Sequence, residues 1–233
     1  MSTGQRLMST GNTELDKKMG GGIPEGSLTL IEGQSGAGKS ILTQQLVWGA
    51  LQAGKHIAYY ATENTSASLI RQMTSLRMDI IDFFLLGRIN IYPIRSSPAG
   101  EEARNLLQAV LRHMNKVQER DVLVFDSLSV FVANIMESDT LAFFTAIKDL
   151  CDQNKTVLLT LHSYAFNEPM FVRIRSISDA YLRLRVGEVG GQLLKEMEVA
   201  KIRGAEQSTG NVIAFDVEPG MGMRIIPMTR AKA

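Results

Sequence analysis

The chain is poor in features that would indicate secretion or membrane insertion. Cys151 is its only cysteine among 233 residues, which excludes an internal disulfide and favours a reducing compartment. No apolar run approaches the length of a membrane span, and the N-terminal residues lack the basic and apolar regions of a signal peptide. We therefore expect a cytoplasmic protein that is not inserted in a membrane and is peripheral to one only through its partners.

The sequence also lacks an excess of charge of one sign. The chain contains 25 Lys and Arg residues and 24 Asp and Glu residues, which gives a formal net charge of +1. This balance gives no global field that gathers nucleic acid, so it argues against a nucleic-acid-binding role. The length and the 45% hydrophobic content suit one large α/β domain. We expect that domain at residues 9–233, behind a disordered segment at residues 1–8.

Apolar runs and helical patterns alternate along most of the chain. The expected strands lie at residues 27–31, 56–63, 89–94, 122–126 and 156–162. The expected helices lie at residues 13–19, 41–52, 66–77, 79–86, 101–118 and 139–153. Short apolar strands between amphipathic helices indicate an α/β fold with a mostly parallel central sheet and helices on both faces. Beyond residue 180, glycine-rich turns predict antiparallel hairpins at one edge of the sheet. Their strands are expected at residues 181–186, 193–201, 212–217 and 223–227.

Residues 33–40 read GQSGAGKS and fit the P-loop pattern G-x-x-x-x-G-K-S/T without deviation. An expected strand precedes this glycine loop and an expected helix follows it, as the binding of a triphosphate requires. Backbone N–H groups and the positive end of the helix would face the phosphates. Lys39 would reach the β and γ phosphates and Ser40 would ligate Mg²⁺. The predicted ATP-binding residues are Gly33, Gln34, Ser35, Gly36, Ala37, Gly38, Lys39, Ser40 and Ile41.

Two carboxylates are candidates for the chemistry beside this loop. Residues 122–126 read VLVFD, the pattern of a Walker B strand, which predicts that Asp126 holds Mg²⁺ directly or through water. Ser127 follows, so no glutamate comes directly after this acid to activate water. Glu63 is the candidate base, because it ends the strand that follows the P-loop helix. The alternative is that Glu63 only caps that strand or is solvated.

Three further polar side chains stand at strand ends or along a strand. His162 ends an apolar strand and is a candidate sensor of the γ-phosphate, or a histidine that merely bonds to the backbone. Lys201 and Arg203 lie two residues apart, so strand alternation sends both side chains to one face. Two such cations usually lie on a solvent-exposed face of a strand, and the residues alone do not determine the role of this pair.

Together these features resemble the RecA superfamily of P-loop NTPases, and within it the KaiC-like branch. The resemblance covers residues 9–228 and is closest to the ATP-binding accessory proteins of the archaellum, the rotary swimming filament of archaea. It is carried by residues 10–16, 20–26, 33–40, 61–65, 126–127, 201–204 and 215–227. The family implies a single RecA-like ATP-binding domain.

The resemblance also implies roles that the residues alone do not. Lys201 and Arg203 match a basic pair that acts at the nucleotide site of the neighbouring subunit, which implies a hexameric ring. The implied partners are the archaellum motor ATPase and components of its cytoplasmic ring or membrane platform. The family pattern has two consecutive glutamates where this chain has Glu63 and Asn64. An amide cannot accept a proton as a base, so we hypothesise that ATP is hydrolysed slowly or not at all.

Two rival functions stay open at this stage. A RecA-like recombination or repair paralogue would bind DNA through a basic, flexible loop, and residues 134–139 and 165–175 are the candidate segments. The first is acidic, whereas the second contains Arg173 and Arg175. A KaiC-like autokinase would instead transfer the γ-phosphate to its own chain.

Overall fold

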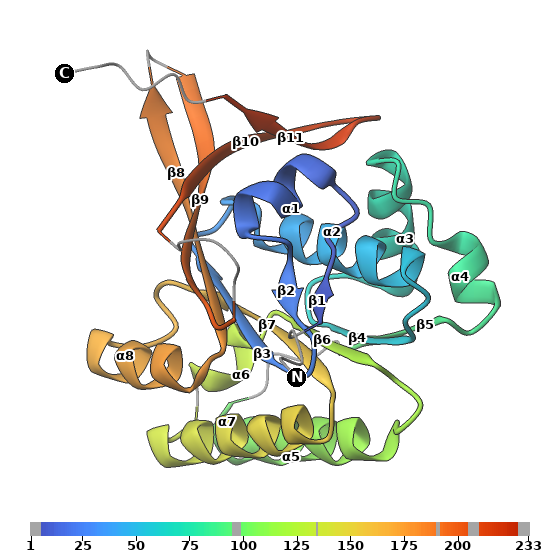
Figure 1. Ribbon diagram of the computed structural model, residues 1–233. Helices are drawn as coiled ribbons and strands as arrows, with labels where there is room; N and C mark the ends of the chain where they lie inside the picture. The colour runs from blue at the N-terminus through green and yellow to red at the C-terminus, as the bar shows by residue number, and fades with distance from the viewer. Residues whose placement is uncertain (1–5, 95–98, 134, 190–191, 205–209, 228–233) are drawn as a thin grey trace, which may run out of the picture.

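The computed structural model describes residues 6–94, 99–133, 135–189, 192–204 and 210–227 (Figure 1). Its strands are β1 (Leu7–Met8), β2 (Ile23–Pro24), β3 (Leu28–Gly33), β4 (Ile57–Ala61), β5 (Ile89–Pro93), β6 (Val122–Asp126), β7 (Thr156–His162), β8 (Ala180–Val189), β9 (Gln192–Ile202), β10 (Val212–Glu218) and β11 (Gly222–Ile226). Within these residues, nine strands form one sheet in the order β11-β10-β9-β8-β3-β7-β6-β4-β5. The strands from β8 to β5 in that order pair in parallel. Strands β8 to β11 pair as antiparallel neighbours.

Helices cover both faces of this sheet. They are α1 (Thr13–Met19), α2 (Lys39–Gln52), α3 (Ser66–Ser75), α4 (Ile81–Leu85), α5 (Gly100–Lys116), α6 (Ser129–Val132), α7 (Glu137–Asp152) and α8 (Glu168–Ile177). In Figure 1, α5 and α7 lie below the sheet, and α1 and α2 lie above it. No helix within the described ranges combines the length and the apolar composition that crossing a bilayer requires.

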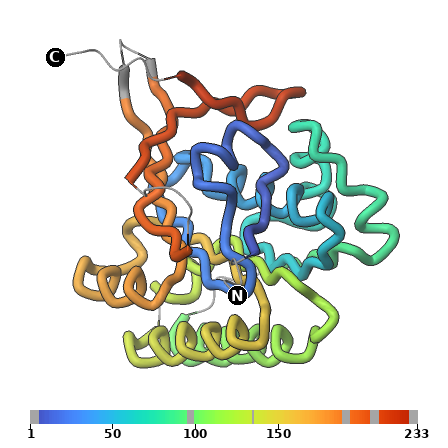
Figure 2. The backbone as a smooth tube through the Cα atoms, in the orientation of Figure 1, coloured from blue at the N-terminus to red at the C-terminus, as the bar shows by residue number. Residues whose placement is uncertain are grey.

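Strand alternation divides the buried side chains between two cores. Val122 and Val124 of β6 pack into the core that α1, α2 and α3 cover. Leu123 and Phe125 of the same strand pack into the core beneath α5, α7 and α8. Since successive side chains of a strand point to opposite faces, a short apolar strand feeds both cores. The predicted α/β fold with a mostly parallel sheet and C-terminal antiparallel hairpins is confirmed. Figure 2 shows the C-terminal hairpin, in red, passing above the N-terminal helix, in blue, where Asn12 Nδ2 donates to Met223 O.

Most element positions follow the sequence expectations, and β6 and β7 occupy the expected residues. Strand β4 is shorter than expected, because its last residue is Ala61 rather than Glu63. Thr62 turns out of the strand: its Oγ1 accepts a hydrogen bond from Ser127 N at 2.8 Å and lies 3.1 Å from Ser127 O. Glu63 therefore lies in the loop beyond the strand end.

The N-terminal expectation was wrong in part. Leu7 and Met8, expected within a disordered segment, form β1 and pair with β2. The backbone that follows packs tightly on α2: a Cβ atom added at Gly49 would lie 2.2 Å from Ser9 O. Glycine thus allows the close approach that holds this segment in place. Residues 1–5 of the expected disordered segment lie outside the described residues.

Residues 165–175, a candidate segment for the DNA-binding loop of a recombination paralogue, are largely helical. Helix α8 begins after Asn167, whose side chain caps it by accepting a hydrogen bond from Met170 N at 2.9 Å. Met170, Phe171 and Ile174 are buried against the second core. Arg175 pairs with Glu32 and with Glu168. The segment is therefore a packed helix in which Arg175 is paired and Arg173 is exposed, rather than the flexible basic loop that a DNA-binding paralogue would need.

Candidate functional site

The glycine loop joins the central strand β3 to the first turn of α2, where the free N–H groups of a helix point outward. Gly38 is the N-cap of α2 and has a positive φ of 96°. A Cβ atom added at Gly38 would lie 3.1 Å from the ring of Phe215 on β10. Glycine is therefore required here both by the backbone conformation and by the C-terminal hairpin packed against the loop.

Lys39 is the first residue of α2, and its side chain folds back over the loop. Its Nζ donates to Gly33 O and to Gln34 O, each at 3.0 Å, and lies 3.2 Å from His162 Nδ1. Because an ammonium has only donors, Nδ1 accepts, so the neutral ring carries its proton on Nε2. Burial lowers the pKa of Lys39, although the charges of Glu63 and Asp126 oppose this effect.

His162 stands at the end of β7 and faces the loop. Its backbone N–H donates to Ser129 Oγ at 2.8 Å, and its Nε2 lies 3.7 Å from Glu63 Oε1. Burial and the neighbouring Lys39 charge lower the pKa of His162, which keeps the imidazole neutral. Its ring stacks on that of Tyr164, at 4.9 Å between centroids, and Tyr164 is 73% exposed.

Asp126 ends β6 and lies between the neighbouring strands. Its Oδ1 accepts hydrogen bonds from Ser40 Oγ at 3.2 Å and from Thr160 Oγ1 at 2.7 Å. Its Oδ2 accepts a hydrogen bond from Tyr59 Oη at 2.7 Å. Burial raises the pKa of Asp126, and the hydrogen bonds from Tyr59, Thr160 and Ser40 counteract part of that rise. The Asp126 carboxylate and the Ser40 hydroxyl therefore lie side by side, and their oxygen atoms could hold a metal ion.

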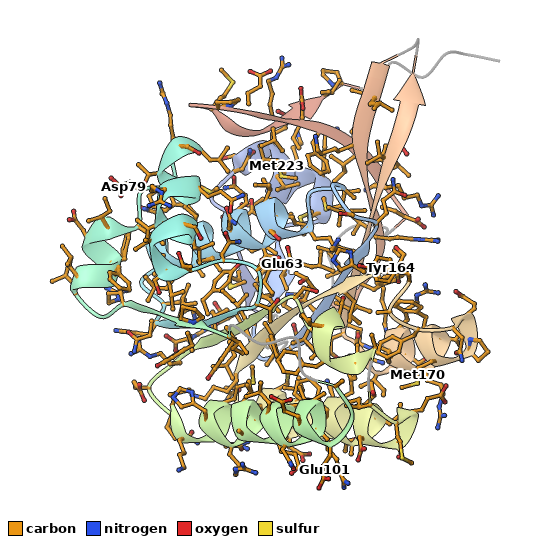
Figure 3. All side chains as sticks on the ribbon, turned by 180° about the vertical axis from the view of Figure 1, so that it is seen from behind. Glu63, Asp79, Glu101, Tyr164, Met170 and Met223 are labelled. Atoms are coloured by element: carbon orange, nitrogen blue, oxygen red, sulfur yellow. The ribbon has the colours of Figure 1, made fainter. Side chains whose placement is uncertain are left out.

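A cavity of about 210 Å³ lies at the carboxyl ends of the parallel strands. Its lining residues are Ser35, Gly36, Gly38, Lys39, Ser40, Ile41, Glu63, Asp126, Ser127 and His162. Figure 3 shows Glu63 near the centre of the molecule, with Tyr164 to one side of it. The structure thus brings together most of the P-loop, Asp126, Glu63 and His162, as the sequence predicts.

Asn64 does not share the orientation of its neighbour Glu63. The Glu63 side chain is 59% exposed and lines the cavity. The Oδ1 atom of Asn64 instead accepts a hydrogen bond from Ser68 Oγ at 3.0 Å. Ser68 is part of the capping box that begins α3. The amide that replaces the family's second glutamate therefore contributes to a helix start.

Lys201 and Arg203 lie at the end of β9 and contact the segment that follows α8. Lys201 Nζ donates to Ser178 O at 2.5 Å and to Arg175 O at 3.2 Å. Arg203 Nη1 pairs with Asp179 Oδ1 at 3.0 Å. Both side chains reach Ser176 O, but β9 ends at Ile202, so Arg203 lies beyond the strand whose alternation was expected to align the pair. Neither residue is part of the cavity lining described above.

The sequence analysis did not identify Tyr59 and Thr160 as site residues. Both lie inside apolar strands, where a tyrosine or a threonine normally signals β propensity rather than function. Their positions in the sheet would have identified them. Each residue lies in a strand that flanks β6, and its side chain points to the same sheet face as that of Asp126.

The P-loop lies between a central parallel strand and its helix, and an aspartate ends the next strand but one, β6. Together with the antiparallel C-terminal extension, these features define a RecA-like P-loop NTPase fold. Residues 8–230 match the model of the KaiC family of ATPases. Over 233 residues the chain is 34% identical to the archaeal flagellar ATP-binding protein FlaH of Sulfolobus acidocaldarius, covering 97% of this chain and 100% of that relative. This chain belongs to the KaiC family of ATPases, and the predicted resemblance to the archaellum accessory proteins is confirmed.

Two solved structures are similar to this chain. The crystal structure of the flagellar accessory protein FlaH from Methanocaldococcus jannaschii matches with a TM-score of 0.85 at 29% identity, over 96% of this chain and 100% of that one. A KaiC-like protein from Pyrococcus horikoshii matches with a TM-score of 0.77 at 21% identity, over 96% of this chain and 100% of that one. The second likeness shows the shared fold alone.

Proposed function

We propose that this protein is an ATP-binding regulatory component of the archaellum motor complex. It binds Mg-ATP through residues 33–41, hydrolyses it slowly or not at all, and acts by nucleotide-dependent assembly and partner binding. The observation that carries the proposal is the meeting of Lys39, Ser40 and Asp126 in one cavity at the start of α2. This combination supplies a cation for phosphates and oxygen ligands for a metal.

The residues of the cavity fit magnesium. The Ser40 hydroxyl and the Asp126 carboxylate are hard oxygen donors 3.2 Å apart. Within the described ranges, no group of three or more His, Cys, Asp or Glu side chains is placed to hold a metal by itself. This fits the usual magnesium site, in which one or two protein oxygens and the phosphates of the nucleotide share the ion. When bound, Mg²⁺ neutralises charge on the β and γ phosphates.

Slow hydrolysis is inferred from the residues beyond β4. Glu63 is mostly exposed and 3.7 Å from a neutral His162, and Asn64 is bonded to Ser68. The Asn64 amide cannot accept a proton from water, so of these two residues only Glu63, which lines the cavity, could act as a base. Loss of a positioned base costs about 10² to 10⁴ in rate. The signal to partner proteins is then whether ATP is bound at the site, rather than how fast ATP is hydrolysed.

The role in motility rests on relatives named for the archaeal flagellum. We propose in addition that the protein is cytoplasmic, peripheral to the membrane at the archaellum base, and in contact with the motor ATPase and the cytoplasmic ring or membrane platform. A ligand that binds only one assembly state stabilises that state by mass action, so nucleotide would control the formation of a hexameric ring. Lys201 and Arg203 would act at the site of the neighbouring subunit.

Titration calorimetry with Mg-ATP and Mg-ADP tests nucleotide binding. We expect Lys39→Ala to weaken binding at least about thirtyfold, because a cation facing phosphates is lost. Lys55→Ala is the matched control, since Lys55 also adjoins α2 but pairs with Glu25 at 2.8 Å. Equal affinities for the wild type and Lys39→Ala would contradict the proposal.

Single-turnover hydrolysis tests the regulatory part of the proposal. We expect slow release of phosphate, and rapid cooperative release would contradict it. Denaturing electrophoresis after incubation with radiolabelled ATP would reveal an autokinase, and salt-dependent binding of single-stranded DNA would indicate a recombination paralogue. Purification of the tagged protein from its host, with identification of bound proteins, tests the archaellum assignment.

A further inference from the structure

We propose that Tyr59 and Thr160 are positioning residues for the magnesium ligand Asp126, and that they set the affinity of the nucleotide site for the metal. The inference rests on the proposed binding of Mg-ATP and assigns two buried hydroxyl groups to the metal half of that site. Neither residue lines the cavity. Both therefore act through Asp126 rather than on the ligand.

The sheet order brings the two hydroxyls to the carboxylate from opposite sides. Strand β6 lies between β4 and β7, and it pairs in parallel with both. Ala61 is directly opposite Asp126 in the β4 register, and its side chain has no polar atom. The hydrogen bond on that side comes instead from Tyr59, two residues earlier and on the same strand face.

The two hydrogen bonds are made to different oxygens of the Asp126 carboxylate. Tyr59 Oη donates to Oδ2 at 2.7 Å, which directs that oxygen toward β4. Thr160 Oγ1 donates to Oδ1 at 2.7 Å, and Oδ1 is also the oxygen that faces Ser40 Oγ at 3.2 Å. With both oxygens held, the carboxylate has one orientation toward the P-loop serine. Partners that hold a ligand in this way are known to tune metal affinity.

Burial increases the cost of losing either hydrogen bond to Asp126. Tyr59 and Thr160 are fully buried and Asp126 is 5% exposed. Water cannot readily replace a lost donor at such a position, and a carboxylate without partners is costly there. Removing either hydroxyl therefore takes one hydrogen bond from the carboxylate and weakens the hold on its orientation toward Ser40, while the strands around it stay packed.

The chain offers a matched control in the next residue. Tyr60 points to the opposite face of β4, and its Oη lies 2.7 Å from His113 Nδ1, in the second core. Tyr59→Phe and Tyr60→Phe each delete one buried phenolic oxygen from the same strand. Only the first deletion removes a contact to Asp126.

The experiment measures the affinity of each variant for a non-hydrolysable ATP analogue by calorimetry, once with Mg²⁺ and once with EDTA. We expect Tyr59→Phe to weaken binding about tenfold or more with Mg²⁺, because a hydrogen bond to a charged group is lost. Binding with EDTA should change by less than about twofold, since the phosphate contacts of the loop remain. Tyr60→Phe should match the wild type in both media.

Thr160 provides an independent pair of variants and covers the case in which Tyr59→Phe does not fold. Thr160→Val keeps the shape and removes the hydroxyl, so magnesium-dependent binding should fall as it does for Tyr59→Phe. Thr160→Ser keeps the hydroxyl and should restore it. Equal losses with Mg²⁺ and with EDTA, or equal behaviour of Val and Ser at position 160, would overturn the inference. A wild-type protein that does not bind the analogue with Mg²⁺ would instead refute the proposed function.

Discussion

Glu32 is buried at the end of β3, one residue before the P-loop. Its side chain is 2% exposed and accepts hydrogen bonds from Arg175 at 2.9 Å and from Tyr181 Oη at 2.7 Å. Arg175 also lies over the rings of Phe171 and Tyr181. The carboxylate is fully paired, which is the condition under which a buried charge is tolerated.

Glu32→Gln should destabilise the fold by about 3 kcal/mol, because it leaves Arg175 without its buried partner. The effect belongs at the low end of the range for broken buried pairs, since 19% of the Arg175 side chain stays exposed. Urea denaturation of the purified variant measures the change in the free energy of unfolding.

Glu168→Gln is the control for this prediction. Glu168 contacts the same guanidinium at 2.6 Å, but its side chain is 68% exposed. Its loss should cost less than about 1 kcal/mol, as is usual for surface pairs. Equal losses for the two variants would show that burial does not govern this network.

For individual residues, the sequence predicted the location of the candidate site better than the side-chain contacts that hold the site together. Lys39, Asp126 and His162 could be placed together because Asp126 and His162 end strands, the loop before Lys39 follows one, and the carboxyl ends of parallel strands share one edge. The partners of Asp126 and Glu32 depend on which strands are neighbours in the sheet. That order joins residues more than a hundred positions apart, such as Glu32 and Tyr181, and no local pattern encodes it.

Elements were predictable where an apolar run had clear boundaries. Strands β6 and β7 are short buried runs flanked by polar residues, so their limits were visible in the sequence. Helix α8 was missed although Asn167 and Pro169 marked its start, because the run after them is short and contains two arginines. Helix α6 has four residues, too few for any periodic signal.

Asp179 joins three elements at the start of β8. Its Oδ2 accepts hydrogen bonds from Leu28 N of β3 at 2.9 Å and from Lys148 of α7 at 2.6 Å, and its Oδ1 pairs with Arg203. Burial by itself would raise the pKa of Asp179, but the hydrogen bonds from Lys148 and Leu28 and the charges of Lys148 and Arg203 outweigh it. The pKa is lowered from 3.8.

A carboxylate whose pKa is lower in the folded protein stabilises the fold above its unfolded value and loses that contribution as the pH falls through the folded value. Stability from Asp179 should therefore be complete at neutral pH and decline below pH 3.8. Asp179→Asn should be less stable than the wild type at pH 7, and the difference should shrink in acid. Urea denaturation over a pH series measures both effects.

Asp149→Asn serves as the comparison, because Asp149 is an exposed carboxylate on the same helix as Lys148. Its acid profile should follow that of the wild type. A difference between Asp179→Asn and the wild type that stays constant down to low pH would contradict the assignment.

For the whole molecule, assembly is the property that the proposed function requires. Arg203 is 55% exposed and pairs within its own chain with Asp179. We predict that Arg203→Ala keeps the affinity of the wild type for Mg-ATP in the monomer but fails to form the nucleotide-dependent oligomer. Sedimentation velocity with a non-hydrolysable analogue measures the oligomer, and calorimetry measures the affinity.

Arg185→Ala is the control for Arg203→Ala. Arg185 has a similar exposure, 51%, and also pairs within the chain, with Glu198 at 2.8 Å. This variant should assemble as the wild type does. If Arg203→Ala also assembles normally, the basic pair has no role at the neighbouring subunit.

The packing of Phe215 against Gly38 has a consequence for the synthesis of the protein. The loop emerges early in translation, whereas β10, which covers it, is among the last strands to be made. Strands β7 and β8, which flank β3, also come more than a hundred residues after it. A nascent chain on the ribosome therefore exposes its glycine loop until β7, β8 and β10 have been made, and only then can the packing around the loop be completed.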